Sequence, residues 1–155
     1  MQEIERKFLV SGNFKEFVTK QYHITQGFLS TVPERTIRIR ITDQKGYITI
    51  KGKSNKSGTT RFEWEKEIPL NEATQLLQLC EPTIIEKIRY IIPSKNELIF
   101  EIDEFLGENL GLFIAEIELP TDKFEFIKPT WIGKEVTGQL KYYNSMLARK
   151  PYTSW

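Results

Sequence analysis

The sequence predicts a mainly β domain of the α+β class, in which an antiparallel sheet of about eight strands curls or closes. Apolar and polar residues alternate with a period of two along most of the chain, as in strands that bury one face. The segments between them are mostly short and carry turn residues, which favours hairpin connections. The length of 155 residues fits one domain, 1–155, and no repeat or linker divides it.

The expected strands follow one another in chain order. Their ranges are 2–10, 22–30, 35–43, 46–53, 60–69, 83–92, 97–105 and 113–119. Turn chemistry marks the breaks, as in SGN at 11–13, VPE at 32–34, DQKG at 43–46 and KSNKSG at 53–58. Helical patterns are short, at 13–19, 71–79, 121–127 and 137–148. We expect these helices to cover part of the outside of the sheet.

Composition argues against several function classes. Lys and Arg number 22 and Asp and Glu 21, so the net charge of +1 gives no overall field that attracts nucleic acid or an anionic membrane. No segment approaches the ~18 apolar residues of a membrane span, and no signal peptide is visible. Cys80 is the single cysteine, so no internal disulfide can form. We expect a cytoplasmic protein without nucleic-acid or membrane partners, and a homodimer is left open.

Charged residues gather on one face of seven of the eight expected strands, all except 22–30. In the first strand, Glu3, Glu5 and Lys7 alternate with Ile4 and Phe8. For a single strand, a solvated face is the simpler explanation. Neighbours of this kind lie about 7 Å apart, and like charges gain nothing from that spacing on an open surface. Like-charged pairs nevertheless recur along the chain: Arg38 and Arg40, Glu63 and Glu65, Lys87 and Arg89, Glu101 and Asp103, and Glu116 and Glu118.

The two signs of charge imply two kinds of partner. Clustered Arg and Lys suit a polyanion, because the guanidinium fork fits phosphate oxygens. Clustered carboxylates without His or Cys nearby suit a hard divalent cation such as Mg²⁺ or Mn²⁺. A metal bridging carboxylates and a polyphosphate joins both clusters. We therefore expect the charged faces to line an interior cavity, with the apolar core between the sheet and the helices.

The sequence resembles the CYTH superfamily, also called triphosphate tunnel metalloenzymes. The opening Glu3-Ile4-Glu5-Arg6-Lys7 has the form ExExK, which alone is a weak signal. The resemblance covers nearly the whole chain, in order, through the charged pairs above, Thr49-Ile50-Lys51 and the closing Trp131-Ile132-Gly133-Lys134-Glu135-Val136-Thr137 before Lys141-Tyr142. The pattern is similar to the short bacterial members, many of which are inorganic triphosphatases. It implies an eight-stranded antiparallel closed β-barrel, a tunnel that binds triphosphate, with helices packed on the outside.

The resemblance also implies roles for individual residues. The phosphate-binding residues would be Lys7, Arg38, Arg40, Lys51, Lys87 and Arg89. The acidic side, which includes the metal ligands, would be Glu3, Glu5, Glu63, Glu65, Asp103, Glu116 and Glu118. We favour Glu116 and Glu118 for a metal that orients the phosphates, and Glu3 and Glu5 for a second metal near the attacked phosphorus. Lys7 and Glu5 are the candidate catalytic residues.

The expected function is hydrolysis of a triphosphate with Mg²⁺ or Mn²⁺, and inorganic tripolyphosphate, giving pyrophosphate and phosphate, is the favoured substrate. Alternatives in the same fold are a class IV adenylate cyclase that makes cAMP from ATP, and a thiamine or nucleoside triphosphatase. A barrel that binds polyphosphate without catalysis is disfavoured, because a pure anion binder does not need so many carboxylates. Close relatives often have Tyr where this chain has Phe28, so any tuning of substrate preference by that hydroxyl is absent here.

Overall fold

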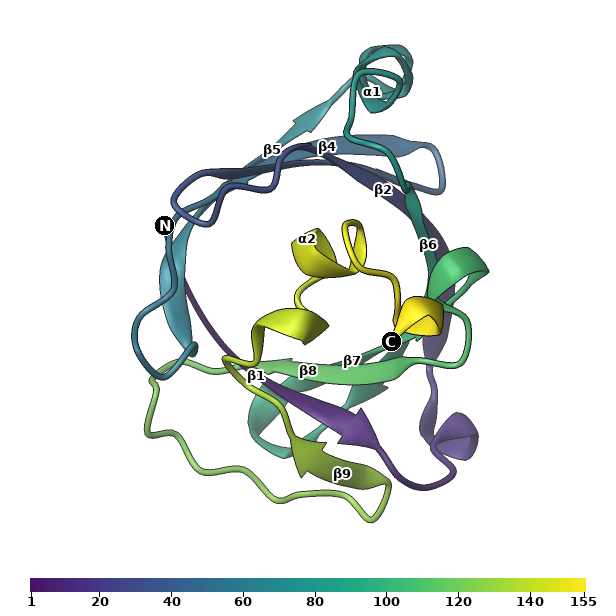
Figure 1. The fold of residues 1–155 in the computed structure, drawn as a ribbon. Helices are drawn as coiled ribbons and strands as arrows, with labels where there is room; N and C mark the ends of the chain where they lie inside the picture. Colours follow the sequence, from purple (N-terminus) through teal and green to yellow (C-terminus); the bar gives the residue numbers. More distant parts are fainter.

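The computed structural model describes residues 1–155 and shows an antiparallel barrel closed by eight strands (Figure 1). The barrel strands are β1 (Gln2–Val10), β2 (Lys20–Ser30), β3 (Thr36–Thr42), β4 (Lys45–Lys51), β5 (Thr60–Ile68), β6 (Ile85–Pro93), β7 (Ile99–Phe105) and β8 (Phe113–Glu118). A short β9 (Ile132–Glu135) is added beside β1. The expected eight strands and the mainly β class are confirmed, and each strand end lies within two residues of its expected position.

The helical elements are few and short. They are α1 (Leu70–Leu77), α2 (Asn144–Leu147) and 3-10 turns at Lys15–Phe17, Lys95–Glu97, Gly107–Asn109, Leu140–Tyr142 and Tyr152–Ser154. None of these helices is long and apolar enough to cross a membrane.

Pairing between β1 and β5 closes the barrel. The hydrogen-bonded order is β5-β4-β3-β2-β6-β7-β8-β1, and Glu3 on β1 lies opposite Arg61 on β5. All of these pairs are antiparallel. Beyond the stretch that pairs with β5, β1 pairs with β9, where Phe8 lies opposite Glu135. The same edge of β1 therefore pairs with β5 near the start of the strand and with β9 near its end.

The strands put charge inside and apolar side chains outside, because alternate residues of a strand face opposite sides. The larger apolar core lies outside the barrel and includes the fully buried Phe8 and Phe100. Trp131 packs edge-on against Phe100 with ring centroids 5.1 Å apart, and Phe126 packs against both phenylalanines. The expected core outside a charged lumen is confirmed, but here an irregular segment, 119–131, covers the sheet instead of a helix.

Two expected helices are wrong. Within 121–127, exposed residues alternate with the half-buried Phe124 and Phe126, so the segment is extended and inserts every second side chain into the core. The range 13–19 forms only the turn Lys15–Phe17. The helix expected at 71–79 is confirmed as α1, and it packs outside the barrel where Gly46 leaves room for Ala73.

The C-terminal segment, defined here as residues 137–155, differs most from expectation. Its helical content is one turn of α2 with short 3-10 turns, and it lies within the outline of the barrel instead of outside it (Figure 1). A second apolar cluster joins this segment to inward-facing strand residues. Its members are Phe28, Ile85, Phe105, Leu112, Ile114, Val136, Tyr142, Leu147 and Ala148. Apolar side chains therefore fill one end of the barrel.

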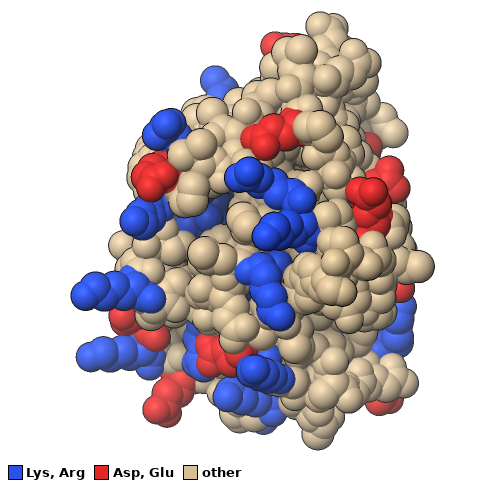
Figure 2. All heavy atoms as spheres, in the orientation of Figure 1, with Lys and Arg blue, Asp and Glu red and all other residues tan.

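The outer surface of this filled end is basic. Figure 2 shows lysine and arginine side chains gathered in the middle of the face that Figure 1 displays, over the C-terminal segment. Lys141, Arg149 and Lys150 of that segment are exposed. Their charge lies outside the barrel and is separate from the charged lumen.

Candidate functional site

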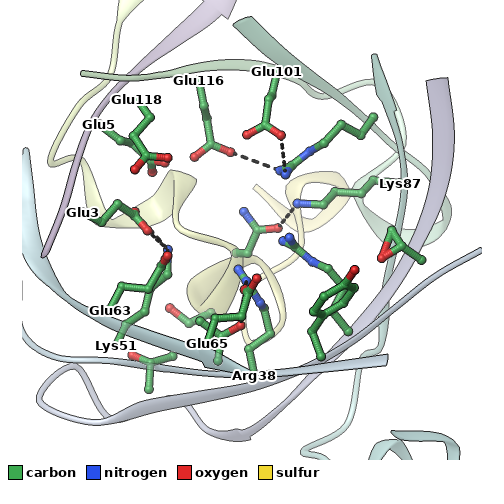
Figure 3. Close-up of a pocket in the computed structure, with 18 of the residues that line it drawn as sticks. Glu3, Glu5, Arg38, Lys51, Glu63, Glu65, Lys87, Glu101, Glu116 and Glu118 are labelled. Carbon is green, nitrogen blue, oxygen red and sulfur yellow. Dashed lines mark hydrogen bonds and ion pairs between the residues drawn. The ribbon is translucent and has the colours of Figure 1, made fainter. Parts of the chain in front are cut away.

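A cavity of about 700 Å³ occupies the lumen beyond the apolar cluster, and only four of its 27 lining residues are hydrophobic. Every candidate residue except Asp103 lines it: Glu3, Glu5, Lys7, Arg38, Arg40, Lys51, Glu63, Glu65, Lys87, Arg89, Glu116 and Glu118. Figure 3 shows the labelled side chains converging from opposite walls. Glu63, Glu3, Glu5, Glu118, Glu116 and Glu101 follow one another around the cavity, Lys87 faces Glu3 across it, and Glu65 lies beside Arg38.

Lys7 joins β1 to β8 through a buried ion pair. Its Nζ lies 2.9 Å from Glu116 Oε2 and 3.6 Å from Glu5 Oε1. Burial lowers the pKa of Lys7, but the charges of Glu116 and Glu5 outweigh it, so the net shift is upward. Lys7 is therefore a permanent ammonium that can donate hydrogen bonds but cannot act as a base.

Glu5 and Glu116 form a coupled carboxyl pair. Burial and the neighbouring charge of Glu116 raise the pKa of Glu5 well above its ordinary value. Burial also opposes ionisation of Glu116, but Lys7 and its interaction with Glu5 hold the pKa of Glu116 well below the ordinary value. The two groups thus favour a single negative charge and share one proton, because two adjacent buried carboxylates repel each other.

Glu3 and Glu63 form a second carboxyl pair around Lys51. Nζ of Lys51 lies 2.8 Å from Glu3 Oε2 and 3.1 Å from Glu63 Oε2. Despite burial, the charge of Lys51 lowers the pKa of Glu3 to about 2. Burial and the interaction with Glu3 raise the pKa of Glu63 to about 7. The pair repeats the pattern of one ionised and one protonated carboxyl beside an ammonium.

Asp103 lies behind the cavity wall and has no exposed surface. Its Oδ1 accepts from Arg89 Nε at 2.8 Å, and its Oδ2 accepts from Lys87 Nζ at 2.7 Å and Arg89 Nη2 at 2.8 Å. Burial opposes ionisation of Asp103, but these two cations hold its pKa below the ordinary value. Both oxygens are occupied, so in this structure Asp103 fixes two basic side chains and presents no oxygen to the cavity.

The basic wall contains guanidinium groups with few acidic partners. Nε of Arg40 donates to Gln26 Oε1 at 2.9 Å, and Arg40 forms no ion pair. Burial, with repulsion from Arg38 and Arg89, lowers the pKa of Arg40 to about 9. Arg38 contacts Glu65 at 3.3 Å, but its buried Nε has no hydrogen-bond partner. The Nη groups of Arg40 make no hydrogen bond within the protein, so an oxyanion in the cavity can accept from them.

The structure adds residues that the sequence did not single out for the site. Tyr22 and Tyr143 line the cavity. Arg61, which alternation with Phe62 places on the charged face of its strand, lines the cavity too and lies over the Tyr143 ring at 5.4 Å without an ion pair. Gln26 could have been recognised, because it shares the inward phase of its strand with Tyr22. Asn144 could not, because it comes from the C-terminal segment, 118 positions from the Gln26 that it contacts.

The carboxylates occur as pairs, and no group of three or more Asp, Glu, His or Cys side chains is arranged to hold a metal ion. Pairs suit Mg²⁺, which keeps several waters and is usually held by one or two carboxylates together with substrate phosphates. The all-oxygen donor set agrees with a hard cation. The residues therefore fit a divalent cation that completes its coordination with substrate.

Residues 1–152 match the CYTH domain. The chain belongs to the CYTH family. It is 46% identical over 155 residues to an inorganic triphosphatase of Acetivibrio thermocellus, a match that covers 99% of this chain and 97% of that protein. An inorganic triphosphatase of Nitrosomonas europaea is 35% identical over 152 residues, covering 96% and 97%.

A solved structure agrees with the barrel. The crystal structure of an inorganic triphosphatase superposes with a TM-score of 0.67 and 30% sequence identity, over 94% of this chain and 96% of that one. The fold and the family expected from the sequence are thereby confirmed.

Proposed function

We propose that this CYTH protein hydrolyses a triphosphate, and that its substrate is inorganic tripolyphosphate. The observation that carries the proposal is the division of one cavity into a wall of underpartnered guanidinium groups and a wall of carboxyl pairs. A polyphosphate needs the first wall, and the metal ions that accompany it need the second. The two relatives named inorganic triphosphatase support the assignment of substrate.

The basic wall binds the phosphate chain. Arg40 offers both terminal nitrogens, because only its Nε is used within the protein. Lys87 has donated to Asp103 and Asn144 and retains one N–H. Arg61 lines the cavity beside the carboxyl groups and is free of ion pairs, so it reaches phosphate near the acidic wall. These donors surround the chain and hold it for attack in line with the breaking bond.

A divalent cation, Mg²⁺ or Mn²⁺, belongs on the acidic wall, as metal dependence is general in this family. We assign it to the carboxyl pairs Glu5 with Glu116 and Glu3 with Glu63. This differs from the sequence expectation, which paired residues two apart on one strand, because the structure brings carboxyl groups together across strands. When bound, the cation neutralises phosphate charge and lowers the pKa of water. Glu118 extends the wall, and its pKa is raised by burial and by Glu3.

The protein's own catalytic groups are Glu5 and Lys7. In hydrolysis a water oxygen forms a bond to a terminal phosphorus, the bridging P–O bond breaks, and pyrophosphate leaves with the bond electrons. Glu5 would lose the proton that it shares with Glu116 when the carboxyl pair holds a cation, and the ionised Glu5 would then accept the proton that the water loses. Lys7 stays an ammonium and stabilises the negative charge that develops on the phosphoryl oxygens. Asp103 takes no part in proton transfer and positions Lys87 and Arg89.

Phosphate release from tripolyphosphate, ATP and pyrophosphate, each with Mg²⁺, Mn²⁺ or EDTA, tests the proposal. We expect release from tripolyphosphate that requires metal and exceeds release from ATP. Cyclic AMP as the main product from ATP would instead identify an adenylate cyclase. Binding of tripolyphosphate without turnover under any metal condition would identify a non-catalytic barrel.

The remaining sequence expectations stay part of the proposal. We infer a cytoplasmic location from the single cysteine, which fits a reducing compartment. The near-neutral net charge of +1 argues against nucleic acid as a partner. A homodimer remains open to measurement by light scattering.

A further inference from the structure

Two amide side chains connect two cations of the basic wall. Oδ1 of Asn144 accepts hydrogen bonds from Lys87 Nζ at 2.8 Å and from Gln26 Nε2 at 2.6 Å. Oε1 of Gln26 accepts from Arg40 Nε at 2.9 Å. Figure 3 marks the bond of Lys87 in the middle of the cavity. The chain Lys87, Asn144, Gln26, Arg40 therefore ties three barrel strands to the C-terminal segment.

The chemistry of the chain fixes the orientation of both amides. Arg40 Nε can only donate, so the Gln26 atom that faces it must be the oxygen. The Gln26 nitrogen then points toward Asn144 and needs an acceptor, which must be the Asn144 oxygen. The same oxygen accepts from Lys87 Nζ, so every contact in the chain is consistent. Neither amide can be turned around without setting two donors or two acceptors against each other.

One donor of this chain remains unused. Both hydrogen bonds of Asn144 are made by its oxygen, which leaves its Nδ2 group without a protein partner. Asn144 lines the cavity, whereas Gln26 is fully buried behind the wall. The Nη groups of Arg40 and the last N–H of Lys87 are also unused within the protein, so one hydrogen-bonded chain holds donors without protein partners on all three residues.

We propose that Asn144 is a substrate-contacting residue, whose Nδ2 donates to a phosphate oxygen held between Lys87 and Arg40, and that Gln26 is the positioning residue that fixes it. The proposal rests on the proposed function, because it requires a phosphate chain in the cavity. It makes the C-terminal segment part of the binding site. Tyr142 and Leu147, buried in the inner apolar cluster, hold Asn144 at this depth in the barrel.

The test compares Asn144→Leu and Gln26→Met with the wild-type protein, using kcat, KM and calorimetric binding of tripolyphosphate. Asn144→Leu removes a hydrogen bond to a charged group, so we expect KM and Kd to rise about tenfold or more. Gln26→Met leaves the contact but frees it to move, and we expect a rise of about threefold to tenfold. Gln75→Leu, an exposed amide on α1, is the matched control and should leave both constants unchanged.

Thermal unfolding of each variant distinguishes a substrate contact from a purely structural role. A purely structural role would lower the melting temperature while KM and Kd of the folded protein stay within about twofold of wild type, and that result overturns the proposal. If Asn144→Leu does not fold, Asn144→Asp replaces it. It keeps both acceptor contacts but exchanges the free donor for an oxygen, so it should fold and bind tripolyphosphate at least about tenfold more weakly. A folded Asn144→Asp protein with wild-type binding overturns the proposal.

The wild-type protein distinguishes this inference from the proposed function. Wild type that binds but does not hydrolyse tripolyphosphate contradicts the function, and the Kd ratios still decide the role of Asn144. Wild type that hydrolyses, with variants that match it, contradicts only the inference. Wild type that neither binds nor hydrolyses tripolyphosphate overturns both.

Discussion

Lys7 and Glu116 lie opposite each other in register on β1 and β8, and their side chains meet inside the barrel at 2.9 Å. The pair joins the two strands beside a third group, Glu5. The carboxyl groups of Glu5 and Glu116 share one proton. An ion pair at this depth contributes net stability only when both partners are present, since either charge alone is buried without compensation.

Replacing Lys7 with Met should therefore damage both stability and catalysis. Loss of the ammonium leaves Glu116 without its nearest cation, and we expect the free energy of unfolding to fall by about 3 kcal/mol or more. Phosphate release from tripolyphosphate should fall by about 100-fold or more, as for the removal of a transition-state donor. Urea denaturation and steady-state assays measure the two effects. The exposed Lys134→Met is the control, and equal behaviour of the two variants would contradict the assigned role.

Replacing Arg40 should affect binding more than stability. Its guanidinium has no acidic partner and is repelled by Arg38 and Arg89, but it donates to the buried Gln26 Oε1, so we expect Arg40→Met to lower the free energy of unfolding by less than Lys7→Met does. The same change should raise KM for tripolyphosphate about tenfold or more, because a charged phosphate contact is lost. The exposed Arg35→Met is the matched control. A destabilised Arg40 variant with unchanged KM would show that Arg40 serves the fold.

Replacing Asp103 distinguishes a role in positioning Lys87 and Arg89 from a role as a metal ligand. Asp103→Asn removes the charge that holds Lys87 and Arg89, and we expect the free energy of unfolding to fall by about 3–5 kcal/mol. The loss of activity should persist at saturating Mg²⁺ or Mn²⁺, since no metal contact has been removed. The exposed Asp122→Asn is the control. Recovery of activity by added metal would instead indicate that Asp103 is a metal ligand.

The second carboxyl pair predicts a pH dependence of stability without metal. The pKa of Glu63 is raised from 4.5 to about 7, so the folded state retains a proton that the unfolded state releases between these values. Because the folded state binds more protons there, this group makes the free energy of unfolding fall as pH rises through the window. Glu63→Gln removes the titration and should flatten this part of the profile.

Denaturant unfolding at pH 5 and pH 8 in EDTA measures the effect. The difference between the two pH values should be smaller for Glu63→Gln than for wild type, while the exposed Glu125→Gln should behave as wild type. Identical profiles for wild type and Glu63→Gln would contradict the coupling of Glu63 to Glu3. Added Mg²⁺ should stabilise wild type more at pH 8 than at pH 5, because the cation competes with the proton for these oxygens.

Alternation of apolar and polar residues predicts most of the barrel strands, because a period of two assigns each side chain to one face of its strand. The same rule assigns Glu3, Glu5 and Lys7 to the lumen and Phe8 to the outer core from the sequence alone. It could not assign β9, whose four residues are too few for a pattern and include Gly133.

The errors have physical causes of their own. The helix expected at 121–127 is wrong, because the spacing of two between Phe124 and Phe126 suits an extended chain that inserts alternate side chains into the core. The sequence shows the charge of Asp103 but not the two neighbouring cations that donate to its oxygens, so its expected place among the metal ligands stays a prediction. Asn144 was missed because its role depends on the C-terminal segment entering the barrel, and no local pattern encodes that packing.

The first measurement should be metal-dependent phosphate release from tripolyphosphate by wild type, Arg38→Ala and Glu116→Ala, with circular dichroism to establish that each protein is folded. Arg38 represents the basic wall and Glu116 the acidic wall of the same cavity. The account predicts turnover by wild type with metal, none in EDTA, and a loss of about 100-fold or more in each folded variant. Full activity and unchanged tripolyphosphate binding in both folded variants would contradict the claim that the two walls form one triphosphate site.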